Sequence, residues 1–217
     1  MEVTGYPTIS STVRAIAEDS NYIYVGGDFT NRFMVIDKAT KAEVAGYPTF
    51  SSGSVTAVAE DSTYIYAGGT MGGYAVGITK STKDIDWIGT PRLSSSGQSV
   101  AQDDTYVYVG GSFTGRFKVY NRTTMVENTG YPTISSTVRA IAEDSNYIYV
   151  GGDFTNRFMV IDKATKAEVT GYPTFSNNVY AVAEDSDYIY VGGGFTGYFK
   201  VIDKATKAEV AGYPPLS

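Results

Sequence analysis

Arginine and tyrosine recur at two equivalent positions of an internal repeat, and they are the residues best suited to bind a ligand. One position, near the start of each repeat, reads Arg14, Gln98, Arg139 and Tyr180, with Thr56 in the remaining copy. The other, after a Gly-Gly pair, reads Arg32, Tyr74, Arg116, Arg157 and Tyr198. A guanidinium offers a fork of donors and a tyrosine ring offers a flat apolar surface, a combination that suits sugars, carboxylates or peptides. The alternative is that these are solvated rim residues, free to vary because nothing packs on them.

An acidic pair also recurs in every copy. It reads Glu18-Asp19, Glu60-Asp61, Asp103-Asp104, Glu143-Asp144 and Glu184-Asp185. Paired carboxylates can bind calcium or perform acid–base work in glycosidases. Here each pair stands beside Ser, Thr or Asp, where a turn uses such side chains to cap its own backbone. We therefore predict a structural turn, and we expect no metal and no cofactor.

The composition excludes several kinds of chemistry. The 217 residues contain no Cys and no His, which removes disulfides, thiolate nucleophiles, imidazole bases and the usual zinc sites. A net charge of -6 argues against nucleic-acid binding. No apolar run reaches the roughly 18 residues of a membrane span, and the start does not resemble a signal peptide. We predict that the chain is not an enzyme and does not insert into membranes.

The phrase YIYVGGDFT and its variants position these side chains. The second Tyr of each copy is Tyr24, Tyr66, Tyr108, Tyr149 and Tyr190, so the spacings are 42, 42, 41 and 41 residues. Each repeat reads as four short strands joined by tight turns, the last of them weaker, as at 43–45. This predicts an all-β fold, a single β-propeller of five four-stranded antiparallel blades. The aromatic residue after Gly-Gly, replaced once by Met71, is expected in the core between blades: Phe29, Phe113, Phe154 and Phe195. An open solenoid of hairpins is the competing architecture.

Two runs carry a resemblance to known families. The paired VID-KATKAEV and YIYVGG elements resemble the YVTN-type propeller repeat, and AIAED followed by YIYVGGDFT is similar to delta-60-type repeats. The Gly-Gly that ends a Tyr-rich strand is kelch-like, although the later Trp of the kelch pattern is missing, since Trp87 is the only one. The resemblance covers the whole chain and implies a propeller; it implies no particular function.

The repeat spans residues 1–217, so we expect one domain. The predicted blades lie at 8–48, 49–91, 92–132, 133–173 and 174–214, and 1–7 is a possible closing strand. A fourth-strand phrase opens the chain as EVTGYP and closes it as AEVAGYP, and either could complete the fifth blade. This redundancy indicates a longer parent array or construction from repeat units.

Residues 4–44 and 129–169 are identical, which indicates recent duplication or deliberate construction. We predict a non-enzymatic binding module that engages glycans or a surface protein through repeated sites on one loop face. A repeat scaffold without a specific ligand is the alternative, and a hydrolase- or lyase-type propeller is the third possibility. We expect a monomer. The compartment stays open, with an extracellular, cell-surface or virion-associated location as the expectation.

Overall fold

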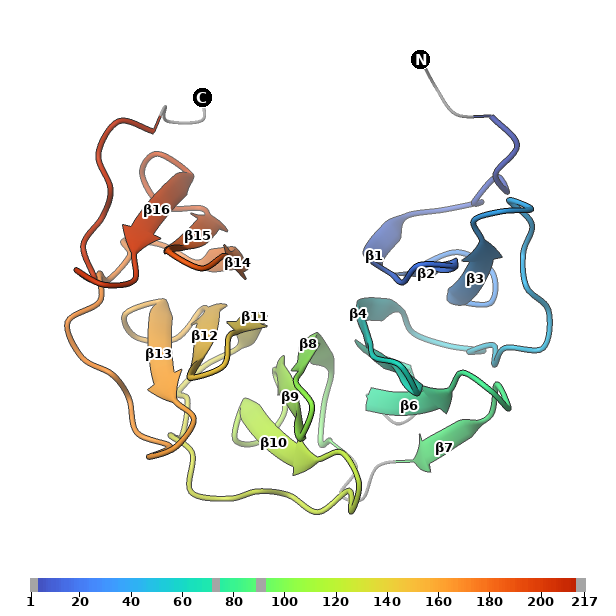
Figure 1. The fold of residues 1–217 in the computed structure, drawn as a ribbon, viewed down its shortest axis with the longest axis horizontal. Helices are drawn as coiled ribbons and strands as arrows, with labels where there is room; N and C mark the ends of the chain where they lie inside the picture. Colours follow the sequence, from blue (N-terminus) through green and yellow to red (C-terminus); the bar gives the residue numbers. More distant parts are fainter. Residues whose placement is uncertain (1–3, 72–74, 89–92, 214–217) are drawn as a thin grey trace. The chain divides into compact units, whose positions relative to one another are not determined.

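The computed structural model describes residues 4–71, 75–88 and 93–213. It contains sixteen β-strands, and no helix lies within the described residues. The strands form five antiparallel sheets of three or four strands each, which agrees with the predicted all-β, five-bladed repeat (Figure 1). Two compact units can be distinguished, residues 1–102 and 103–217. That the sheets close one ring, and form one domain, stays a prediction.

Unit 1 contains eight strands. The first sheet has the order β1-β2-β3 and the second has the order β4-β5-β6-β7. The bounds are β1 Val13–Glu18, β2 Tyr22–Gly27, β3 Phe33–Asp37, β4 Val55–Glu60, β5 Tyr64–Gly69, β6 Ala75–Thr79, β7 Ile85–Ile88 and β8 Gly97–Gln102.

Unit 2 contains the other eight strands. In this unit β10 pairs with β9, and two further sheets have the orders β11-β12-β13 and β14-β15-β16. The bounds are β9 Tyr106–Gly111, β10 Phe117–Asn121, β11 Val138–Glu143, β12 Tyr147–Gly152, β13 Phe158–Asp162, β14 Val179–Glu184, β15 Tyr188–Gly193 and β16 Phe199–Asp203.

The fourth strand is weaker than the other three, as its sequence indicates. Within the described residues only the second sheet has one, β7, whose IDWI sequence is rich in branched and aromatic residues. In the other sheets the equivalent segment, Ala-Glu-Val in three of them and Val-Glu-Asn in the third sheet, makes a single bridge, such as Ile36 with Glu43 or Ile202 with Glu209. A glycine with positive φ follows within three residues, as at Gly46, and turns the chain away. Glu209 of the closing phrase therefore bridges to the fifth sheet. The possible closing strand at 1–7 falls partly on residues 1–3, outside the described residues.

A β-bulge lies in the first strand of four sheets. Val13 pairs with Gly27 and Ala15 pairs with Gly26, so Arg14 is the extra residue between them. The same shift occurs in β4, β11 and β14. Bulges redirect a side chain out of the regular alternation of a strand. In these four sheets the variable position near the start of the repeat is therefore the bulge.

The core lies between successive sheets of each unit. In unit 1, Met71 packs with Tyr24 and Phe33 of the preceding sheet, and in unit 2 Phe195 packs with Tyr149 and Phe158. The five residues predicted for this core are at most 2% exposed: Phe29, Met71, Phe113, Phe154 and Phe195. Their predicted burial is confirmed.

Candidate functional site

The loop after the Gly-Gly pair fixes the second set of predicted site residues. Arg32, Arg116, Arg157 and Tyr198 all have φ between 56° and 64°, in the left-handed region that costs energy for such residues. The turn is closed by a backbone bond; the Arg32 N–H donates to the Phe29 carbonyl at 3.0 Å. The guanidinium also folds back, and Arg32 Nη1 donates to the Asp28 carbonyl. Arg116 and Arg157 make the equivalent contacts to the Ser112 and Asp153 carbonyls.

The bulge brings the first set toward the same loop. Arg14 holds Asp28 with two donors, Nε to Oδ1 at 2.8 Å and Nη2 to Oδ2 at 2.7 Å. Arg139 repeats this geometry on Asp153, with distances of 2.6 and 2.7 Å. Hydrogen bonds from Arg14 and Ser54 lower the pKa of Asp28 to about 2. In the first and fourth sheets, therefore, both predicted arginines contact the same aspartate, one at its carboxylate and the other at its backbone carbonyl.

The other predicted residues are less closely joined. The Arg139 guanidinium lies over the Tyr180 ring, 5.5 Å from its centroid, and pairs the fourth sheet with the fifth. Tyr180 and Tyr198 are 53% and 54% exposed. Gln98 is half-buried on β8. Tyr74 lies outside the described residues.

A groove lies beside this loop in unit 1. It has a volume of about 540 Å³ and lies between the first and second sheets. Its walls combine hydroxyls, amides and a carboxylate with one arginine and two phenylalanines: Ser10, Ser11, Asp28, Phe29, Thr30, Asn31, Arg32, Thr49, Phe50 and Ser51. Arg32 and Asp28 belong to both the groove and the arginine–aspartate contact. Such a surface presents hydrogen-bonding groups beside two aromatic rings.

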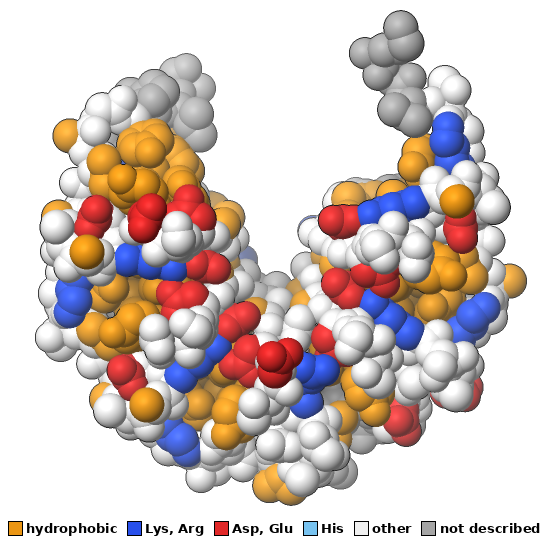
Figure 2. Space-filling view, viewed as in Figure 1, with side chains coloured by type: hydrophobic (Ala, Val, Ile, Leu, Met, Phe, Trp, Pro, Cys, Tyr) orange, Lys and Arg blue, Asp and Glu red, His pale blue; other side chains and the backbone are white. Residues whose placement is uncertain are grey.

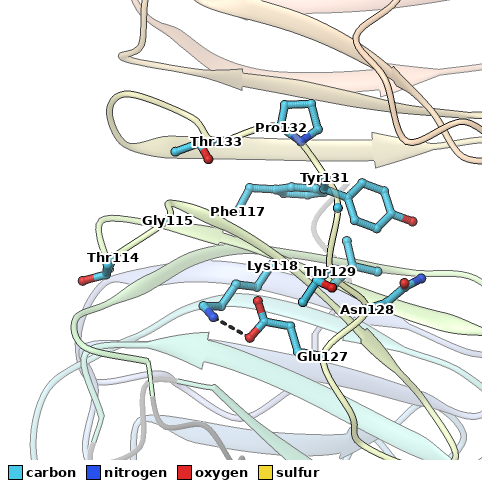
Figure 3. A pocket seen from close by; sticks show the side chains of 12 residues that line it. Thr114, Gly115, Phe117, Lys118, Glu127, Asn128, Thr129, Tyr131, Pro132 and Thr133 are labelled. Carbon is cyan, nitrogen blue, oxygen red and sulfur yellow. Dashed lines mark hydrogen bonds and ion pairs between the residues drawn. The ribbon is translucent and has the colours of Figure 1, made fainter.

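Two smaller cavities lie in unit 2, at places in the repeat that are equivalent to each other. The cavity of about 270 Å³ lies between β10 and the following Gly-Tyr-Pro segment, where Lys118 Nζ meets Glu127 Oε2 at 2.6 Å (Figure 3). The cavity of about 170 Å³ lies beside β13, where Met159 takes the place of Lys118. The two cavities differ in charge although they lie at the same place in the repeat. They are therefore features of how the repeat packs and not two copies of one ligand site.

The acidic pair forms a turn, as predicted. Asp19 Oδ1 accepts the N–H groups of Asn21 and Tyr22 at 2.9 and 2.8 Å. Asp19 Oδ2 accepts the buried Tyr24 hydroxyl at 2.6 Å. The same tyrosine-to-aspartate bond recurs in all five copies, at 2.5 or 2.6 Å. Burial, followed by this bond, raises the pKa of Tyr24 well above its ordinary value.

A lysine that sequence reasoning missed joins these turns. Lys80 Nζ binds Asp19 of the preceding sheet at 2.7 Å and also Glu60 of its own sheet. Lys163 bridges Asp103 and Glu143, and Lys204 bridges Asp144 and Glu184. Acidic and basic side chains accordingly alternate on the visible face of each unit (Figure 2). The signal was present, because a cation follows the third strand in every copy: Lys38, Lys80, Arg122, Lys163 and Lys204.

These bridges set the protonation of the carboxylates. Burial alone would raise the pKa of Asp144, but bonds from Lys204, Tyr149 and two backbone N–H groups lower it to about 2. Burial raises the pKa of Glu143, against the opposing effect of Lys163. In the described part of the chain, no group of three or more Asp or Glu side chains is placed to hold a metal ion.

The geometry defines a class, an all-β protein of repeated antiparallel sheets. The likeness to solved structures agrees: the crystal structure of the computationally designed Ika8 protein is similar, with a TM-score of 0.65 over 94% of this chain and 76% of that one. The two share 19% sequence identity, so the likeness concerns the fold alone. No protein-family model matches the chain, and no curated protein matches it. No helix in the described ranges is long and apolar enough to cross a membrane.

Proposed function

We propose that the chain is a non-catalytic repeat scaffold, in which the repeated polar residues join and stabilise successive sheets. One observation carries this proposal. The repeated acidic turns, which would supply the acid–base groups of an enzyme, accept hydrogen bonds from their own backbone and from a tyrosine hydroxyl, and three of them also bind a lysine. Lys80 on Asp19 and Lys204 on Asp144 are examples, at 2.7 and 2.8 Å.

Two further observations support this reading over a dedicated binding module. The chain contains 41 residues written twice without change, and its fold is similar to that of a computationally designed protein. Both fit a scaffold assembled from repeat units, whether by recent duplication or by construction. The arginines expected to bind a ligand are also engaged locally, as Arg32 is by the Asp28 carbonyl.

A binding screen tests the scaffold proposal. The purified chain is applied to an array of glycans and cell-wall polymers, with a variant carrying Arg32→Ala, Arg116→Ala and Arg157→Ala as the matched control. We expect no saturable signal that distinguishes the two proteins. Saturable binding by the parent chain that the triple variant loses would overturn the proposal.

The groove beside Arg32 favours a second candidate function, weak binding of a glycan or a surface protein. Its hydroxyls and amides, with the half-buried Phe50, offer hydrogen bonds and an apolar contact, as sugar rings require. Equivalent sites in several sheets would add avidity. The discriminating variant is Asn31→Ala with Ser51→Ala, which changes the groove without touching the arginine–aspartate pair. Loss of a saturable signal in this variant supports the second candidate.

A further inference from the structure

Successive sheets fit together through a glycine slot. A Cβ at Gly26 would lie 2.4 Å from Val55 Cγ1 and 3.1 Å from Val58 Cγ2, both on the first strand of the next sheet. A Cβ at Gly151 would lie 2.3 Å from Val179 Cγ1 and 3.0 Å from Val182 Cγ2. The slot exists because glycine has no side chain, and the two branched residues of the next sheet fill it.

The first and last sheets each carry one half of this fit. At Gly192, the equivalent of Gly151, a Cβ would meet, among the described residues, only Ala181 Cβ at 3.6 Å and the Tyr198 carbonyl at 3.9 Å, both within its own repeat. On the first sheet, Val13 is 37% exposed and Ile16 is 64% exposed. The residues equivalent to Val13 are fully buried wherever a preceding sheet covers them: Val55, Val138 and Val179.

The lysine bridge between the acidic turns of successive sheets is likewise only half present at each end. Lys38, in the position of Lys204, contacts only Glu18 and the Asp19 carbonyl of its own sheet among the described residues. Asp185, in the position of Asp144, accepts bonds from its own turn and from Tyr190, and no ion pair to a lysine is present within the described chain. One end thus offers a cation and the other offers a carboxylate.

We infer that a second copy of this chain docks head to tail: Val13 and Ile16 of one copy enter the Gly192 slot of the other, and Lys38 bridges to Asp185. The contact continues an interface that each unit already contains, with the same residue types in the same order. Such a heterologous contact closes a ring when the rotation allows and otherwise extends into a filament. This goes beyond the scaffold proposal and differs from both the monomer and the closed ring expected from the sequence.

In the docked pair, the opening phrase of the entering copy takes the place of its neighbour's Gly212-Tyr213 segment. Lys41 binds the Thr4 carbonyl at 2.9 Å and lies over the Tyr6 ring, as Lys207 binds Thr170 of the preceding sheet. The first sheet therefore already holds a copy of the phrase that a preceding sheet would supply. The docking contact then needs only the first strand and Lys38.

Two variants each block one half of the contact. Ile16→Glu places a charge on the entering residue, which is exposed and has no packing to lose. Gly192→Val fills the slot, where the nearest atoms leave room for the added carbons. The 217-residue chain, each variant and an equimolar mixture of the two variants are compared by size-exclusion chromatography with light scattering over a range of concentrations.

The mixture makes the test independent of folding. We expect the parent chain to give a mass that is a multiple of 23.3 kDa, and each variant alone to give 23.3 kDa. In the mixture, the intact end of each variant meets the intact end of the other, and we expect a species of twice that mass that does not extend further. A parent chain that stays at 23.3 kDa at every concentration, as internal closure would give, overturns the inference. So does a mixture of folded variants that stays monomeric.

Discussion

Gly151→Val perturbs the contact between sheets at its tightest point. The first added carbon would stand 2.3 Å from Val179 Cγ1 and 3.1 Å from Val179 Cβ, and Val179 is fully buried. Neither Val179 nor its neighbour Val182 can move without disturbing the core around Tyr149. Overpacking of this kind costs about 1–3 kcal/mol, and the three extra carbons place this variant near the upper end, about 3 kcal/mol. For a chain of this size that lowers the melting temperature by about 6–12 °C.

The matched control is Gly192→Val, the same change at the equivalent position without a neighbour. A Cβ there makes only ordinary contacts with the described residues, and valine suits a strand, so we expect a change within about 0.5 kcal/mol. Both variants are placed in an Ile16→Glu background, which removes association, and are unfolded by urea and by heat. Equal losses of stability in the two variants would refute the glycine-slot reasoning.

Three further predictions concern the acidic turns. Lys163→Met leaves two half-buried carboxylates without their cation, so we expect the free energy of unfolding in urea to fall by about 1–3 kcal/mol. Lys38→Met is the control, and we expect it to cost less than about 1 kcal/mol because its Glu18 partner is mostly exposed. Tyr149→Phe removes a part-buried bond to the Asp144 carboxylate and should cost about 1.5–3 kcal/mol, more than Tyr190→Phe, whose bond to Asp185 is exposed; equal costs would contradict the role of burial. Because the folded pKa of Asp144 lies near 2, below its ordinary 3.8, its contribution is present above pH 3.8 and is lost as the pH falls toward 2; Asp144→Asn should flatten stability measured over that interval.

Much of the fold follows from the sequence because the repeat is written so clearly. Tyrosine and branched residues ending in Gly-Gly define the second strand, and the regular spacing multiplies the signal. The phenylalanine after the pair was predicted in the core, where Phe195 lies. The weak fourth strand was also visible, since Ala-Glu-Val before a glycine has little to hold it in a sheet.

The polar contacts were less predictable, since they join residues that a strand pattern treats separately. Arg14 reads as an ordinary strand residue, and only the bulge turns it onto Asp28. A comparison of the copies contained the clue, because arginine at the bulge occurs only where aspartate follows Gly-Gly. The lysine bridge spans about 60 residues, from Lys80 to Asp19, and no local pattern reveals such a pairing.

The central claim is that each sheet is stabilised by the neighbour that covers its first strand. Two identical segments test it directly, since β1 and β11 share the sequence VRAIAE while Val13 is 37% exposed and Val138 is fully buried. NMR-detected hydrogen exchange on dilute, unassociated chain compares their amides. We predict faster exchange in β1 than in β11. Equal protection of the two strands would contradict the account.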